Sequence, residues 1–199
     1  MQDFKETMDR RGSLLQLGGL FVALAGTGHV QAAPSEGEDG GYDEDSILKA
    51  ATDFFGDSTE GLARVIEKAF KEQGRPNAFI KGEEVGAALS VGLRYGEGRL
   101  QMKSGANAPV FWAGPSIGFD AGVNASKVFT LVYHLPKPAA IYQRFPGVDG
   151  SLYYVGGAGI NYQRLKGITL APIRLGVGLR AGASVGYVHY RSKKSYNPF

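Results

Sequence analysis

The chain has 199 residues, 30 of them glycine, and a formal net charge of +3. This length is sufficient for one domain with a buried core. The absence of cysteine excludes disulfides, thiolate metal sites and cysteine nucleophiles. Residues 98–199 contain 12 basic side chains but only two acidic ones, Asp120 and Asp149. This basic half favours an anionic partner such as phospholipid head groups; alternatively, it neutralises the acidic first half within one fold.

Residues 1–32 have the order of an export signal. Basic side chains in the first eleven residues precede an apolar stretch over 14–28, and Val30-Gln31-Ala32 fits the small-x-small cleavage rule. We therefore predict cleavage after Ala32 and a periplasmic protein. The alternatives are a retained N-terminal helix and, for the route, the twin-arginine pathway instead of Sec. No later apolar run is long enough for a transmembrane segment in the mature chain.

Residues 33–45 are acidic and rich in glycine, so we expect a flexible acidic tail. Two helices are predicted over 46–73. In the second, over 57–73, Asp57 and Glu60 form a capping-box-like start and Gly74 provides the C-cap. Its apolar residues form one stripe that can cover a sheet. They are Leu62, Val65, Ile66, Ala69 and Phe70.

The range 78–199 has the pattern of β-structure. From Ile173 to Tyr190 apolar residues alternate with glycine, small residues and arginine, and the same pattern runs from Val85 to Gly96. Period-two alternation predicts strands whose apolar, odd-numbered face is buried. Glycine allows long strands to coil sharply, which indicates a small closed barrel. The residues expected to be buried include Leu89, Val91, Val177, Leu179 and Val185.

Short glycine-containing segments separate the predicted strands. We expect hairpin turns at Gly96-Glu97-Gly98, Gly122-Val123-Asn124 and Leu165-Lys166-Gly167. Sequential hairpins give an antiparallel meander, and the lack of long helices between strands disfavours a parallel sheet. The predicted fold class is therefore α+β: a small antiparallel β-barrel (meander) with two N-terminal helices packed on it, as a single domain over 46–199.

One motif resembles a catalytic signature. Gly114-Pro115-Ser116-Ile117-Gly118 matches the G-x-S-x-G nucleophile elbow, with His134 or His189 as the available base. The elbow requires a strand followed by a helix, whereas alternation continues here after Ser116. We expect no enzyme and keep a serine hydrolase using Ser116 as the less favoured alternative. We also expect no cofactor, no metal site and no nucleic-acid partner.

Aromatic and charged residues of the loops are the best candidates for binding. The longest irregular connection, over 136–150, carries most of them, and it is the best place for a functional loop. They would form an amphipathic pocket for a lipid-like ligand at the barrel mouth. Alternatively, the rings plug the barrel end and Arg144 pairs with Asp149 or Asp120. The candidate binding residues are Trp112, Tyr142, Arg144, Phe145, Asp149 and Arg174.

Several segments together resemble the envelope integrity protein A family of Gram-negative bacteria, over roughly residues 47–199. They include Gly74-Arg75-Pro76-Asn77-Ala78-Phe79-Ile80, Trp112-Ala113-Gly114-Pro115-Ser116-Ile117-Gly118-Phe119-Asp120, Arg144-Phe145-Pro146-Gly147-Val148-Asp149-Gly150-Ser151 and the terminal Asn197-Pro198-Phe199. The resemblance implies a periplasmic small β-barrel with accompanying helices, similar in fold to SYLF lipid-binding domains and without assigned catalytic residues.

The residues and the resemblance together lead to one expected function. We expect a non-enzymatic periplasmic protein that supports cell-envelope integrity by binding a lipid-like or anionic envelope component, such as a lipid or an anionic polymer. The alternative is a structural or adaptor protein that binds envelope proteins.

Overall fold

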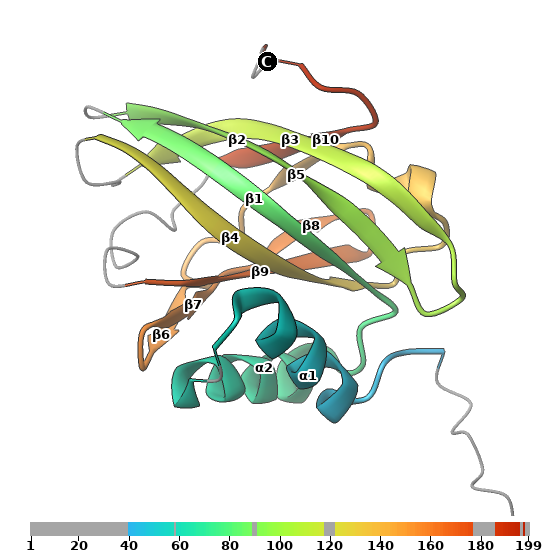
Figure 1. The fold of residues 1–199 in the computed structure, drawn as a ribbon. Helices are drawn as coiled ribbons and strands as arrows, with labels where there is room; N and C mark the ends of the chain where they lie inside the picture. Colours follow the sequence, from blue (N-terminus) through green and yellow to red (C-terminus); the bar gives the residue numbers. More distant parts are fainter. Residues whose placement is uncertain are drawn as a thin grey trace, which may run out of the picture. The chain divides into compact units, whose positions relative to one another are not determined.

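The structure, a computed structural model, describes residues 40–57, 59–88, 91–117, 122–176, 186–195 and 197. Within these ranges two helices precede ten strands, and Figure 1 shows the helices packed together against the curved sheet. The two α-helices are α1 (Glu44–Phe55) and α2 (Glu60–Gln73), and a short 3-10 helix, η1 (Pro138–Ile141), lies further along the chain. The strands are β1 (Ala78–Ala88), β2 (Val91–Met102), β3 (Asn107–Ile117), β4 (Gly122–Tyr133), β5 (Arg144–Pro146), β6 (Tyr153–Val155), β7 (Ala158–Ile160), β8 (Gln163–Leu165), β9 (Ile168–Leu175) and β10 (Tyr187–Arg191).

Both α-helices begin at side-chain N-caps. Asp43 Oδ1 accepts a hydrogen bond from the backbone N–H of Ser46 at 2.8 Å, so α1 begins at Glu44 and not at residue 46. Thr59 Oγ1 caps α2 by accepting from the N–H of Leu62 at 3.1 Å. The predicted start of this helix at Asp57 is therefore wrong. The predicted apolar stripe is confirmed: Leu62, Val65, Ile66 and Ala69 are buried and Phe70 is half-buried.

The N-terminal boundary of the fold lies earlier than expected. The N–H of Tyr42 donates to the carbonyl of Pro76 at 2.8 Å, and its ring lies 5.2 Å from that of Phe79. Residues 42–45, expected to be part of the flexible tail, therefore contribute to the packed structure. The predicted export signal over 1–32 and the rest of the tail over 33–39 lie outside the described residues.

All strand pairs are antiparallel, in the order β5-β10-β3-β2-β1-β4-β9-β7-β6, with β8 also pairing with β9. β1, β2 and β3 are sequential neighbours, but β4 returns to pair with β1 and not with β3, which is a Greek-key order. A bridge between Gly147 and Gln163 links the segment after β5 to β8. The α+β class, the antiparallel barrel-like sheet and the two helices packed on it are confirmed, whereas the strand order departs from a simple meander.

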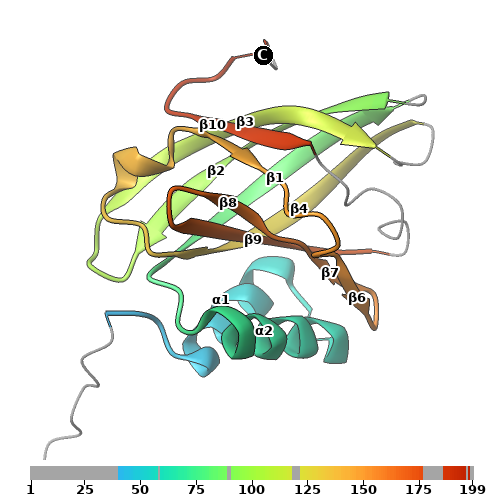
Figure 2. The same ribbon diagram turned by 180° about the vertical axis from the view of Figure 1, so that it is seen from behind.

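Two apolar layers hold the described part together. On the inner face of the sheet, even-numbered residues such as Ile80, Leu100 and Leu170 form one core. On the outer face, odd-numbered residues such as Phe79 and Phe129 pack against α1 and α2. Figure 2 shows these helices beneath β9, with the β6–β7 hairpin beside them. Because β9 has the inner core on one face and the helices on the other, nearly all of its residues are buried.

Two of the three predicted hairpin turns are wrong. Gly96-Glu97-Gly98 lies inside β2, and Gly122-Val123-Asn124 begins β4. The third, at Leu165-Lys166-Gly167, is confirmed: φ is +49° at Lys166 and +82° at Gly167, and two consecutive positive values are typical of a type I′ turn. The alternation that begins at Ile173 predicts one strand as far as Arg191, and this prediction is also wrong. β9 ends at Leu175, and five neighbouring pairings separate it from β10 in the sheet.

The predicted burial of the apolar face fails in one part of the sheet. Val85 is 46% exposed and Leu93 is 37% exposed, while their even-numbered neighbours Glu84 and Arg94 are each only 1% exposed. In this part of the sheet the charged side chains are buried and the apolar ones are exposed, which is the reverse of the prediction. The expected burial of Leu89, Val91, Val177, Leu179 and Val185 lies outside the described side chains and stays a prediction.

Candidate functional site

A carboxylate and two arginines meet on the inner face of the sheet. Glu84 comes from β1, Arg94 from β2 and Arg174 from β9, and all three are buried. The guanidinium of Arg174 donates to both carboxylate oxygens of Glu84, from Nε at 3.2 Å and from its terminal nitrogen at 3.1 Å. A terminal nitrogen of Arg94 lies 3.7 Å from Glu84 Oε1. Trp112 Nε1 on β3 donates to Glu84 Oε2 at 2.9 Å.

The charges of this cluster determine what chemistry it can perform. Burial of Glu84 opposes ionisation, but the charges and hydrogen bonds of Arg174, together with the charge of Arg94, outweigh this effect and hold its pKa at about 2. Burial lowers the pKa of Arg94 to about 10. The carboxyl of Glu84 and the guanidinium of Arg94 are therefore charged at neutral pH. A carboxylate that is so weak a base is poorly suited to accept protons, so the cluster fits an electrostatic role better than general base catalysis.

Glycines opposite Trp112 make room for its indole ring. A Cβ atom on Gly96 would lie 2.0 Å from Trp112 Cε2, and one on Gly82 would lie 2.6 Å from the ring. The ring also lies beside Tyr190, with centroids 6.0 Å apart, and Tyr190 contacts Phe145 edge-on at 5.8 Å. The glycines of the inner face therefore accommodate a large aromatic side chain and do not form a turn.

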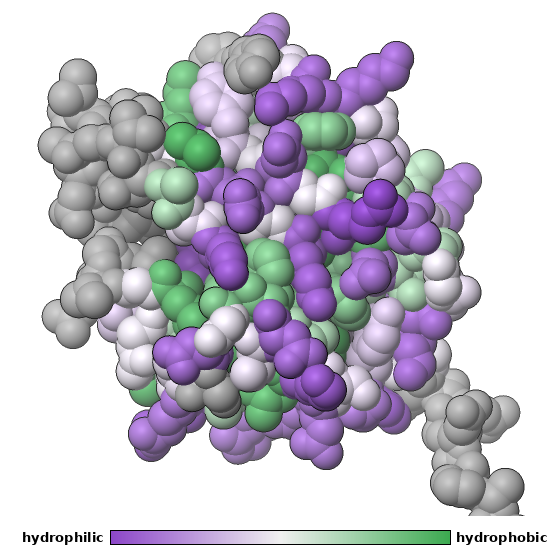
Figure 3. Space-filling view, in the orientation of Figure 1, coloured by the Kyte–Doolittle hydropathy of each residue, from purple (hydrophilic) through white to green (hydrophobic). Residues whose placement is uncertain are grey.

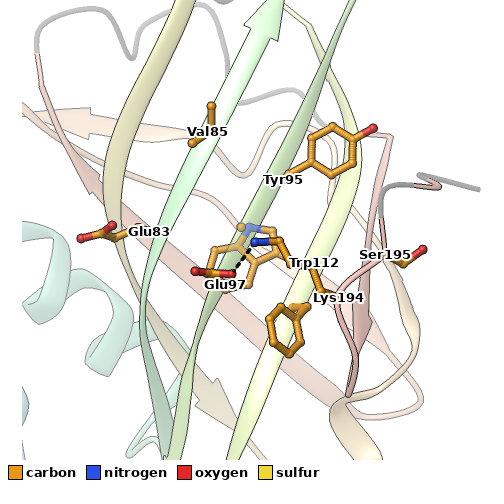
Figure 4. A pocket seen from close by; sticks show the side chains of 9 residues that line it. Glu83, Val85, Tyr95, Glu97, Trp112, Lys194 and Ser195 are labelled. Carbon is orange, nitrogen blue, oxygen red and sulfur yellow. Dashed lines mark hydrogen bonds and ion pairs between the residues drawn. The ribbon is translucent and has the colours of Figure 1, made fainter.

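A groove of about 330 Å³ lies on the sheet at β1, β2 and β3 beside the C-terminal segment. Val85 and Tyr95 are register partners on β1 and β2, and Phe111 of β3 also lines the groove. Figure 4 shows the ion pair between Glu97 and Lys194, whose charged atoms are 3.1 Å apart, crossing the groove below Val85 and Tyr95. The groove therefore combines an apolar wall with a charged border.

A second, polar cleft of about 440 Å³ lies between α2 and the turn over 148–151. Lys68 and Glu72 of α2 form one wall. Asp149 and Tyr153 form the other, and Arg164 of β8 also lines the cleft.

The structure brings some predicted binding residues together and separates others. Trp112 and Arg174 meet at Glu84, and Phe145 is joined to them through Tyr190. Tyr142 instead packs on the inner core and donates its hydroxyl to the carbonyl of Pro109 at 3.0 Å.

Arg144 and Asp149 both lie away from this cluster. The exposed guanidinium of Arg144 stacks over the ring of Tyr187 at 4.9 Å, and Asp149 lines the polar cleft. Among the described residues they form no ion pair with each other, so the pairing of Arg144 with Asp149 is wrong. Its pairing with Asp120 stays a prediction, because Asp120 lies outside the described residues. Burial of Phe145 agrees with the alternative in which a ring fills the barrel.

The nucleophile-elbow motif adopts another geometry. Residues 114–117 lie within β3, where Ser116 is paired with Gly92 of β2. A nucleophile elbow needs a tight turn from strand to helix, and this backbone is extended at the serine. His134 lies exposed in a turn after β4 with a φ of +57°, and His189 contacts Arg191. No group of three or more metal-ligating side chains occurs among the described residues.

Sequence reasoning missed Glu84 and Arg94 as members of the buried cluster. A signal was present, because each stands alone on a strand face otherwise made of glycine and small residues. A single charge on such a face, together with an opposite charge on another strand of the same pattern, indicates a buried pair, since unpaired charges are seldom buried.

The comparisons with known proteins agree with this architecture. A solved crystal structure of a beta-barrel-like, uncharacterised protein from Brucella abortus is similar with a TM-score of 0.74 and 40% sequence identity, over 80% of this chain and 99% of that chain. No curated protein matches the chain. None of the helices in the described ranges is long and apolar enough to cross a membrane. The family of envelope integrity protein A matches residues 40–199, and the chain belongs to this family.

Proposed function

We propose that the protein acts in the periplasm as a non-enzymatic binder of envelope lipid, through the part of its outer sheet face that the helices leave open. The observation that carries the proposal is the exposure of Val85 and Leu93 on that face. Exposed apolar side chains gathered on one face mark interaction sites more often than isolated ones do. Membership of an envelope protein family supports an envelope ligand.

The apolar residues form adjacent rows across neighbouring strands. Val85 lies opposite Tyr95 on β2 and opposite Ala125 on β4. Leu93 lies opposite Pro115 on β3. Because cross-strand partners share one face of a sheet, these side chains form a continuous apolar area next to the groove. A groove with an apolar wall can hold part of an acyl chain.

A band of charged side chains borders the apolar rows on the side of the helices. Lys81 lies opposite Arg99, and Glu83 lies between Lys127 and Glu97. With Lys194 beside Glu97, this border contains four cations and two carboxylates. Figure 3 shows hydrophobic patches among bands of hydrophilic side chains on the molecule. An excess of cations at the border of an apolar area suits anionic phospholipid head groups.

Binding of the purified mature protein to phospholipid vesicles tests the proposal. The probes are vesicles of phosphatidylethanolamine with phosphatidylglycerol and vesicles of a neutral phospholipid alone. We expect sedimentation with the anionic vesicles, weakened by salt. Val85→Glu should weaken binding about tenfold, or about 1.4 kcal/mol, since a carboxylate would have to enter an apolar contact.

The matched control is Leu152→Glu, because Leu152 is an apolar side chain of similar exposure, 40%, outside the groove. It should bind vesicles like the wild type. Wild-type protein that sediments with neither kind of vesicle would contradict the proposal. If Val85→Glu nevertheless failed to restore envelope integrity to a strain lacking the gene, while accumulating to the wild-type level, this face would instead dock an envelope protein, as in the adaptor alternative.

A further inference from the structure

The polar cleft beside α2 is separate from the open sheet face and has the features of a second site. It shares Lys68, Glu72 and Tyr153 with an adjoining cleft of about 360 Å³. We infer that these two clefts together bind a neutral saccharide of the envelope, one sugar ring in each. This inference does not depend on lipid binding.

The wall formed by α2 presents polar groups in fixed positions. Glu72 accepts hydrogen bonds from Lys68 on its own helix and from the hydroxyl of Tyr162, the latter at 2.6 Å. The bond from Lys68, followed by that from Tyr162, lowers the pKa of Glu72, so its carboxylate stays ionised and accepts further hydrogen bonds from hydroxyl groups. Gln73 at the end of α2 is held by Arg164 at 3.1 Å. Pairs along a helix are common on protein surfaces, so this wall alone would indicate no site.

The opposite wall is a turn anchored to the strands. The N–H of Ser151 donates to the carbonyl of Val148 at 3.2 Å, and Gly150 has the positive φ of +69° that a type II turn requires. Ser151 Oγ also donates to that carbonyl at 2.6 Å and accepts from the N–H of Tyr162 at 3.0 Å. The N–H of Val148 donates to the carbonyl of Tyr162 at 2.9 Å.

This anchored turn presents the carboxylate of Asp149 to the cleft. No side chain among the described residues forms an ion pair with Asp149, although Lys68 and Arg164 line the same cleft. A rigid turn that carries an acceptor without a structural partner is what a preorganised hydrogen-bonding site needs.

Tyr153 supplies an aromatic surface between the two clefts. It is half-buried and lines both clefts, and the ammonium group of Lys68 lies 4.8 Å from its ring centroid. The C–H face of a pyranose packs well on an aromatic ring, while its hydroxyls need carboxylate, amide and hydroxyl partners at the ring edge. Each cleft also has a volume within the range of small-ligand sites.

The charges of the clefts favour a neutral ligand over a polyanion. Lys68, Lys71 and Arg64 are each already bonded to a carboxylate of α2. Arg164 is the remaining cation of the lining, and Asp149 stands near it as an added negative charge. A polyanion would therefore gain little, and binding of the saccharide should depend only weakly on salt.

Two soluble probes distinguish a cell-wall saccharide from one of lipopolysaccharide. The first is chitotriose, which has the repeating sugar of cell-wall glycan, and the second is a neutral outer polysaccharide of lipopolysaccharide, freed of lipid and core. NMR titration of the purified mature protein should show binding of at least one probe. Asp149→Asn and Tyr153→Leu should each weaken it about tenfold, with little change on raising the salt concentration. The denaturation midpoints should stay near that of the wild type, since both positions are at least partly exposed.

Two control variants lie outside the lining of both clefts. Tyr154→Leu alters the neighbouring ring, whose hydroxyl donates to the carbonyl of Gly176 at 3.2 Å and which does not line either cleft. Asp53→Asn removes an exposed carboxylate paired with Lys49 on α1. Both should bind like the wild type. The inference is overturned if neither probe binds at millimolar concentration, or if binding is undiminished in either cleft variant.

Discussion

Replacement of Glu84 by glutamine should destabilise the protein strongly. Glutamine keeps the shape of the side chain but removes the charge that faces Arg174 at 3.1 Å and Arg94 at 3.7 Å. The lowering of the carboxyl pKa from 4.5 to about 2 corresponds to about 3 kcal/mol of stabilisation. Removal of one partner from a buried ion pair typically costs about 3–5 kcal/mol, because the other charge is left uncompensated. We therefore expect a loss of about 3 kcal/mol or more.

Urea denaturation at several pH values measures this loss and its origin. A depressed carboxyl pKa contributes stability that is fully present above pH 4.5 and is lost as the pH falls toward 2. The difference in unfolding free energy between wild type and Glu84→Gln should thus be largest near neutral pH and shrink between about pH 4.5 and 2. Taking the difference removes the contributions of the other carboxylates.

Glu97→Gln is the matched control, because Glu97 pairs with Lys194 on the surface with more than half of each side chain exposed. This substitution should change stability by less than about 1 kcal/mol. A loss below about 1 kcal/mol for Glu84→Gln, or a difference from wild type that does not change with pH, would refute the assignment of Glu84 as the charged centre of the cluster.

Three further predictions concern other elements. Gly96→Ala should destabilise by about 1–3 kcal/mol and shift the fluorescence of the only tryptophan, since its methyl group would meet the Trp112 ring; an unchanged denaturation midpoint would contradict this packing. Lys127→Met should cost about 0.5–1 kcal/mol in the same assay, since Lys127 Nζ donates to the carbonyl of Phe54 at 2.9 Å at the end of α1; Lys81→Met is its control and should have less effect. N-terminal sequencing of the native protein should find Ala33 first, and an intact Met1 would refute the export signal.

Local patterns were sufficient to predict the helices but not where they begin. The stripe from Leu62 to Ala69 follows the helical period, which depends only on neighbours along the helix. The sequence Asp57-Ser58-Thr59 offers three residues that can each cap a helix, and the choice of Thr59 depends on packing that no local pattern records.

The errors in the sheet have a different cause. Gly96 and Gly98 look like a turn because glycine is common in turns. In the structure the backbone of Lys81 lies against Gly98 and the ring of Trp112 lies over Gly96, so neither position has room for a side chain. Both contacts come from other strands. Likewise, the alternation from Val85 to Tyr95 is real, but alternation alone does not determine which face is inside. The inner face carries the pair of Glu84 and Arg174, which are 90 positions apart in sequence, and no local window contains both residues.

The candidate site was predictable only in part. Trp112 and Arg174 were expected because aromatic and arginine residues are common at binding sites, and the structure places both in the buried cluster. Asp149 was expected in a functional loop, and the structure places it on the anchored turn beside α2. The partners across that cleft, Lys68 and Tyr162, belong to segments whose proximity is set only by the docking of α2 on the sheet.

The position of β10 has a consequence for how the protein reaches its native state. This strand pairs with β3 through Tyr190 and Trp112, so the sheet is completed only when both distant segments are available. Pairings between segments far apart in sequence are intrinsically slow to form. Until β10 adds, β3 keeps an unpaired edge beside apolar side chains, a state prone to aggregation. Chaperones that cover this open edge of β3 during folding should therefore raise the yield of native protein.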